Sequence, residues 1–164
     1  MKTEITFSLS AQAIVDQALA LDALKRCTHS AETDNLLGRD HAPAILEATK
    51  MAFAQLALLL VPHVADSAIN DEAASQQSVN SASASLLMSI TLRLPDDITS
   101  GGQGVIRRLL EHALTMLALT AVYAASDTAA SDRYRQLALD SVERLRKFAD
   151  SGEKIPTRTA LCWI

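Results

Sequence analysis

The sequence predicts a mainly α-helical protein: a body of four helices with a small two-stranded β ribbon, a long polar loop and an extended C-terminal tail. Three observations predict this fold class. Alanine and leucine, both strong helix formers, dominate a hydrophobic fraction of 49%. Aromatic residues make up only 4% and there are only 5 glycines, which argues against an all-β fold. Apolar residues recur at helical spacing in four segments and alternate in two others.

The length and charge of the chain limit what it can be. Its 164 residues correspond to one domain, residues 1–164, large enough to fold without a disulfide or a metal. The net charge of −4 lacks the basic excess of proteins that bind DNA through phosphates, so we expect no sequence-specific nucleic acid as a partner. The basic residues near the C-terminus alternate with acidic ones, which is typical of a solvated helix face.

Two segments are predicted to form strands. In residues 2–9, Ile5, Phe7 and Leu9 alternate with polar residues, and residues 86–94 show the same period of two. Because each strand needs a partner for its backbone N–H and C=O groups, we expect the two to pair with each other in a ribbon against the helices.

Four segments are predicted to be helices: residues 11–27, a segment from about Asp40 to Val64, a segment from the glycines at 101–104 to about Ala125, and residues 132–149. Ser10 and Asp40 are predicted N-caps, and Pro62 predicts a kinked or irregular last turn in the second helix. The glycines predict a flexible start for the third helix, which is apolar all round and is therefore expected to be central.

Two segments fall outside this helical body. Residues 66–85 are rich in Ser, Ala, Asn and Gln and are predicted to form a flexible polar loop. Residues 154–164 are predicted to form an extended C-terminal arm that finishes with four apolar residues. A terminal apolar cluster that includes the only tryptophan is expected to dock somewhere.

No residue pattern predicts catalysis, a metal or a cofactor. Cys27, His29 and His41 lack the spacing of a zinc site. His63 is interpreted as a capping or packing residue, and consecutive helical residues such as Glu111 and His112 point about 100° apart, which is poor geometry for an acid–base pair. The glycine cluster lacks the Lys-Ser/Thr of a phosphate-binding loop. We therefore expect that the protein is not an enzyme.

The sequence also predicts neither secretion nor membrane insertion. The N-terminus has no apolar signal segment, and the longest uncharged apolar run, residues 113–125, is too short to span a bilayer. Two cysteines form no disulfide framework, so a reducing, cytoplasmic setting is expected. No membrane is expected as a partner.

The order of these segments resembles a family of small virion proteins of tailed phages and prophages. The resemblance is carried by the opening strand Glu4-Ile5-Thr6-Phe7, the helical segment at residues 52–59, the polar insertion, the strand ending Leu92-Arg93-Leu94-Pro95, the long apolar helix, and the last helix leading to Ile155-Pro156-Thr157-Arg158. The family is similar to head–tail connector, adaptor or neck proteins.

This resemblance implies a structural subunit of a phage-like particle. It implies a homo-oligomeric ring, with copies of itself and neighbouring portal or tail proteins as partners, located in the virion and in the host cytoplasm during assembly. The interface residues implied lie in the C-terminal arm: Pro156, Arg158, Leu161, Trp163 and Ile164. Packing of this arm on its own helices stays an open alternative, as does a helical ligand-binding or regulatory module with a pocket between the helices.

Overall fold

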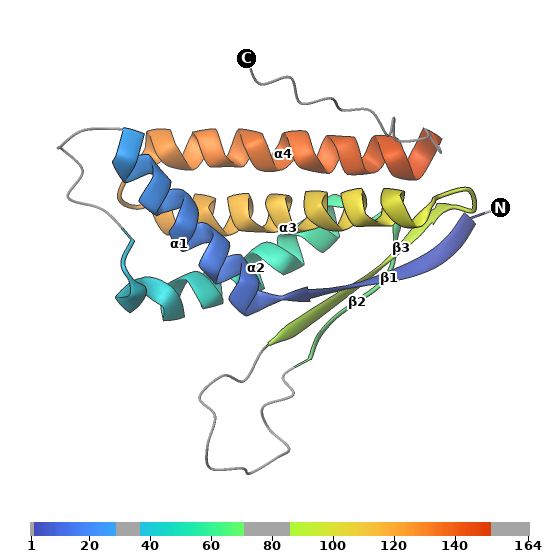
Figure 1. Ribbon diagram of the computed structural model, residues 1–164, viewed down its shortest axis with the longest axis horizontal. Coiled ribbons are helices and arrows are strands. Elements are labelled where there is room, and N and C mark those ends of the chain that lie inside the picture. The colour runs from blue at the N-terminus through green and yellow to red at the C-terminus, as the bar shows by residue number, and fades with distance from the viewer. Residues whose placement is uncertain (1, 29–36, 71–85, 152–164) are drawn as a thin grey trace, which may run out of the picture.

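The computed structural model describes residues 2–28, 37–70 and 86–151 (Figure 1). Four helices and three strands form this described part, as the mainly α-helical prediction requires. In chain order the elements are β1 (Lys2–Ser10), α1 (Ala11–Thr28), the short 3₁₀ helix η1 (Arg39–His41), α2 (Ala42–Leu59), β2 (Val64–Asn70), β3 (Leu87–Pro95), α3 (Ser100–Tyr123) and α4 (Thr128–Ser151).

The strands form an antiparallel sheet in the order β1-β3-β2. The predicted pairing of the two sequence-identified strands is confirmed, with Phe7 opposite Ile90 and Leu9 opposite Met88. These residues are buried on the inner face, whereas Thr6 and Thr91 lie on the outer face with their hydroxyl oxygens 2.9 Å apart. The period of two therefore identified both the strands and the face that enters the core.

The prediction of only two strands is wrong. Residues 64–70 form β2, which pairs with the other edge of β3, so the predicted flexible loop at 66–85 begins within a strand. β2 is an edge strand with a register shift between Val64 and Asp66, and most of its residues are exposed or half-buried. Polar side chains at a sheet edge stay in contact with solvent and cost little free energy. This explains why residues 64–70 show only a weak alternation of apolar residues. Residues 71–85 lie outside the described residues.

Helix α3 lies at the centre of the fold, as predicted. It contacts α1, α2 and α4, and α3 and α4 run side by side in Figure 1. Every residue from 113 to 119 is buried, so this part of the helix meets protein on all sides. The main cluster of buried side chains combines residues of all four helices with the inner face of the sheet.

Helix starts follow the sequence only in part. The prediction for Ser10 is confirmed, because the backbone N–H of Ala13 donates to its Oγ at 3.4 Å. The predicted flexible glycine segment is wrong: residues 101–104 form the first turn of α3, and Thr99 caps it by accepting from the N–H of Gly102 at 3.2 Å. Asp40 does not cap α2, because η1 leads directly into this helix and no side chain caps it.

Helix ends also agree in part with the sequence. α2 ends at Leu59, and a turn through Pro62 leads to β2, so the predicted irregular last turn is confirmed. Asp127 caps α4 by accepting from the N–H of Ala130 at 2.9 Å. On α4 Val142 is buried, whereas Leu137 is exposed. The tail at 154–164 lies outside the described residues.

Candidate interaction surface

A row of apolar side chains covers the outer face of α2 and the turn after it. Met51 and Leu58 are 71% and 72% exposed, and Val61 is 59% exposed. Ala54 is exposed between them. The spacing of three, four and three residues places helical side chains on one face, and it is the spacing on which another helix or peptide packs. We call Met51, Ala54, Leu58 and Val61 the α2 stripe.

The opposite face of α2 belongs to the core. Its buried residues, at the same three- and four-residue spacing, are Ile45, Ala48, Thr49, Ala52, Phe53 and Leu56. The one buried hydroxyl among them, that of Thr49, donates to the carbonyl of Ile45 within the helix at 2.7 Å. The helix is therefore apolar on two faces, of which the described part of the domain covers one. Single exposed apolar residues are ordinary, but a row of them is typical of an interaction site.

The apolarity of α2 is also visible in its mean hydropathy. The span Arg39–Leu59 reaches a mean hydropathy of 1.2, which together with its length would suffice to cross a membrane. However, a third of that window is buried inside the domain. The buried share is the face that contacts α3 and α1, and the exposed share includes the α2 stripe.

Charged groups border the stripe at both ends. At its N-terminal side, Lys50 and Glu47 form an ion pair of 2.9 Å. At its C-terminal side, the Arg146 guanidinium donates to the carbonyl of Leu59, with Nε at 3.1 Å, and Asp150 lies 3.5 Å from Nε2 of His63. These last contacts join the end of α4 to the end of α2.

His63 has the packing position that the sequence suggested. Its side chain is buried in the turn between α2 and β2, and Nε2 faces Asp150. Its Nδ1 atom is buried and has no hydrogen-bond partner in the part of the chain that the structure describes.

His112 and Ser141 form a pair that resembles the start of a catalytic arrangement. Nδ1 of His112 lies 2.9 Å from Oγ of Ser141, which joins α3 to α4. Burial, with the Arg144 charge as the second cause, lowers the pKa of His112. However, Ser141 is buried and its hydroxyl donates to the Leu137 carbonyl at 3.1 Å. A substrate carbonyl has no access to this oxygen, so the pair fastens two helices together.

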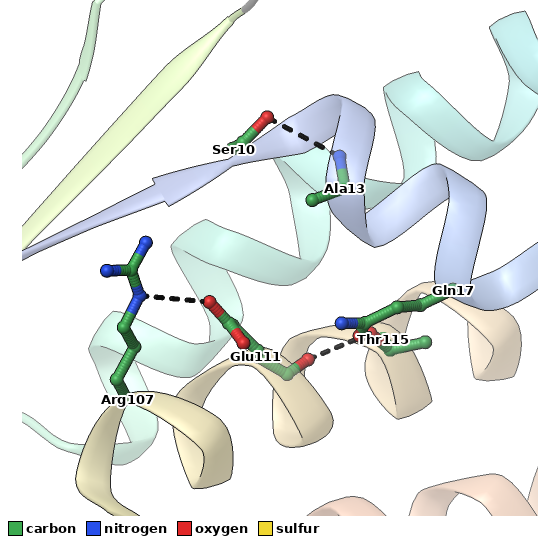
Figure 2. Close-up of polar contacts among 6 residues, drawn as sticks. All are labelled: Ser10, Ala13, Gln17, Arg107, Glu111 and Thr115. Atoms are coloured by element: carbon green, nitrogen blue, oxygen red, sulfur yellow. Dashed lines mark hydrogen bonds and ion pairs between the residues drawn. The ribbon is translucent and has the colours of Figure 1, made fainter. Parts of the chain in front are cut away.

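Glu111 turns away from His112, as expected for consecutive helical residues. It accepts from Nε of Arg107 at 3.1 Å, while its backbone carbonyl accepts from Thr115 (Figure 2). Oγ1 of Thr115 also lies 3.1 Å from Oε1 of Gln17, where α1 crosses α3. This polar crossing positions α1 and involves no convergent acid and base.

A buried polar network joins α1 to α3. Asp22 is buried, and its carboxylate accepts from the hydroxyl of Tyr123 and from the N–H of Leu37 at 2.9 Å. Tyr134 of α4 stacks on Tyr123 with ring centroids 5.7 Å apart. Burial, followed by the hydrogen bond and charge of Asp22, raises the pKa of Tyr123. Because the carboxylate already has two donors, the network is suited to holding elements together.

The remaining residues singled out in the sequence are distributed as follows. His41 Nδ1 accepts from the N–H of Gly38 at 3.0 Å, so it closes the η1 turn. His29 and the side chain of Cys27 lie outside the described residues. Among the residues that are described, no three His, Cys, Asp or Glu side chains gather as metal ligands would. The implied interface residues Pro156, Arg158, Leu161, Trp163 and Ile164 also lie outside the described residues.

The α2 stripe itself was missed in the sequence. Its signal was present: once Phe53 and Leu56 are assigned to the core face, Met51 and Leu58 remain on the opposite face of the same helix.

No protein-family model, curated protein or solved structure matches the chain.

Proposed function

We propose that the protein is a structural assembly subunit that acts through protein–protein contacts, and that copies of it associate through the α2 stripe. The observation that carries this proposal is the row of Met51, Leu58 and Val61, which lies on the side of α2 opposite its buried residues. Following the family resemblance, the assembly is a ring of the head–tail connector, adaptor or neck type, in contact with neighbouring portal or tail proteins of a phage-like particle.

The size of the stripe favours many weak contacts over one strong contact. Burying a Val, Leu or Met side chain contributes about 1.5–3 kcal/mol, and association costs roughly 4–15 kcal/mol. The three partly exposed side chains of the stripe therefore give a weak pairwise contact. In a closed ring each copy contacts two neighbours, with its stripe against a different surface of the next copy, so the same weak contact is repeated around the axis and the last contact is intramolecular.

The proposal gives the protein no catalytic role. Its support is that His112, with Nδ1 2.9 Å from a side-chain hydroxyl, faces a buried and already hydrogen-bonded Ser141. The polar groups described above connect helices and turns to one another.

The experiment that tests the proposal is the mass of the particle in solution. Light scattering over a wide concentration range should give a mass above that of one chain that rises with concentration. Charge placed on the stripe, as in the double variant Met51→Glu/Leu58→Glu, should return the mass to one chain while the helical circular dichroism stays unchanged. Leu139→Glu on α4, which changes another exposed leucine, is the matched control and should assemble normally.

Two results would contradict the proposal: one chain at every concentration, or the same assembly for the wild type and the double variant. A monomer whose melting temperature shifts saturably with a small molecule would instead indicate the alternative, a helical ligand-binding or regulatory module.

A further inference from the structure

We propose that residues 160–164 dock intramolecularly on the α2 stripe and compete there with the association of copies. This inference rests on the proposed function, because it concerns the same surface and states how its availability is regulated. The occupant is an apolar segment of the same chain that carries Leu161, Trp163 and Ile164.

The segment that carries residues 160–164 begins at the end of α4, which lies close to the stripe. The end of α4 is fixed beside the end of α2, because Arg146 donates to the Leu59 carbonyl and Asp150 lies 3.5 Å from His63. Leu59 directly follows Leu58, and His63 lies two residues after Val61, so both are close in sequence to the C-terminal end of the stripe. The chain therefore leaves α4 next to the C-terminal end of the stripe.

Residues 152–160 are long enough to bring residues 160–164 to the stripe. Residues 152–160 span up to about 30 Å when extended, at roughly 3.3 Å a residue. The stripe from Met51 to Leu58 rises only about 10 Å, and a helix with its side chains is about 10 Å across. The segment that follows α4 is thus long enough to pass around the end of α2 and run along its outer face.

The α2 stripe has the size of a peptide-binding patch. A stable interface between folded proteins buries about 800 Å² of each partner, far more than three partly exposed side chains provide. A short peptide with one tryptophan and two branched aliphatic residues matches a patch of this size. Met51 adds a favourable partner for an indole ring, because thioether sulfur contacts aromatic rings well.

Because residues 160–164 belong to the same chain as the stripe, their effective concentration at the stripe is high. A short flexible tether holds a ligand at about millimolar effective concentration near its site. In dilute solution residues 160–164 therefore occupy the stripe in preference to a second copy. At high local concentration, as on a growing ring, a neighbouring copy displaces them. The segment acts as a cover that delays assembly.

Trp163 is the only tryptophan in the chain, so the wild-type protein reports its own docking. In dilute, single-chain solution the emission should be blue-shifted, shielded from acrylamide and independent of protein concentration. In Met51→Glu/Leu58→Glu the emission should shift to that of exposed indole with full quenching, and the control Leu139→Glu should match the wild type. An exposed indole in the wild type, or a shielded one that the double variant does not change, would overturn the proposal.

A truncated chain that ends at Arg158 gives the second readout. Removing the competitor should lower the concentration at which half of the chains assemble, by about tenfold or more for a segment that is docked most of the time. A higher midpoint would mean that the segment bridges neighbouring copies, and an unchanged midpoint would mean that it does not occupy the stripe. Both overturn the intramolecular docking and leave the proposed function standing.

The two proposals fail in distinguishable ways. If the wild type and the truncated chain remain single chains at every concentration, the assembly function is wrong, and the tryptophan emission alone still decides whether the segment docks. If the mass rises with concentration while Trp163 is exposed in dilute solution, only the cover is wrong.

Discussion

Helices α2 and α3 are both strongly apolar, yet they have different roles in the molecule. α3 contacts α1, α2 and α4, and all of its residues from 113 to 119 are buried. Among the described residues α2 is covered on one face, and Met51 and Leu58 on the other face are exposed. The amino-acid composition does not distinguish the roles of the two helices, whereas the elements that pack against each helix do. α3 holds the fold together, and α2 uses half of its apolar surface for the fold and presents the other half.

The sharpest test of this difference compares one leucine from each helix. Leu114→Ala should lower the free energy of unfolding by about 2–5 kcal/mol, because Leu114 is fully buried and its loss leaves a cavity. Leu58→Ala, made in the chain that ends at Arg158 so that residues 160–164 are absent from the stripe, should change it by less than about 0.5 kcal/mol, as expected for an exposed site. Urea denaturation followed by circular dichroism measures both, and equal losses would contradict the division of roles.

The next largest effect is expected where α3 meets α1. Tyr123→Phe should lower the free energy of unfolding by about 1–3 kcal/mol, because it removes a hydroxyl donor from the buried carboxylate of Asp22. Tyr134→Phe is the matched control, since it keeps the stacked ring and leaves the bond between Tyr123 and Asp22 intact. Similar losses in the two variants would mean that the hydrogen bond is not what holds α1.

The same tyrosine predicts an alkaline limit to stability. Burial raises the pKa of Tyr123 in the folded state above that of the unfolded chain, which is about 10. The resulting stabilisation is complete below pH about 10 and is lost as the pH rises through the higher folded pKa. Thermal unfolding above pH 10 should therefore decline more steeply in the wild type than in Tyr123→Phe, and parallel curves would argue against the network.

A smaller effect is expected at the start of α3. Thr99 caps this helix, whereas no side chain caps α2. Thr99→Ala should cost about 1 kcal/mol, and Thr99→Ser should retain most of the stability because it keeps the accepting oxygen. Equal losses in both variants, measured by urea denaturation, would show that the methyl group and not the cap is important.

The smallest effect concerns the contact between α3 and α4. Burial and the Arg144 charge lower the pKa of His112 below its ordinary value of 6.5. A lowered pKa stabilises the fold above pH about 6.5 and loses that stabilisation as the pH falls. The melting temperature of the wild type should therefore drop between pH 7 and pH 5 slightly more than that of His112→Gln. A steeper drop in the variant would contradict the direction of the shift.

Patterns with a strong period were sufficient to predict much of the fold. Ile5, Phe7 and Leu9 gave both β1 and its inner face, and the uninterrupted apolar run of α3 gave its central position. β2 escaped prediction because residues at a sheet edge need little hydrophobicity, and Asp66 and Ser67 are typical of a loop. The glycines at 101–104 were misjudged because Thr99 and the contacts of α3 outweigh the low helix propensity of glycine.

The candidate surface was harder to predict than the fold. Leu58 and Leu56 have similar side chains and lie two residues apart, yet one is 72% exposed and the other is fully buried. Periodicity shows that α2 has two apolar faces, but which face the domain covers depends on where α3 and α1 lie in three dimensions. That is a tertiary property, and only coordinates provide it.

The strand order has a consequence for how the chain acquires its structure. β3, the middle strand, is the last of the three to be synthesised, and the residues of β1 pair with residues of β3 that lie 77 to 93 positions later in the sequence. Before β3 has been synthesised, β1 and β2 have no partner strand. The sheet therefore forms only after Pro95 has left the ribosome. Contacts between such distant segments slow folding. A nascent chain that stalls before residue 87 would present two unsatisfied strands to chaperones and to other nascent chains.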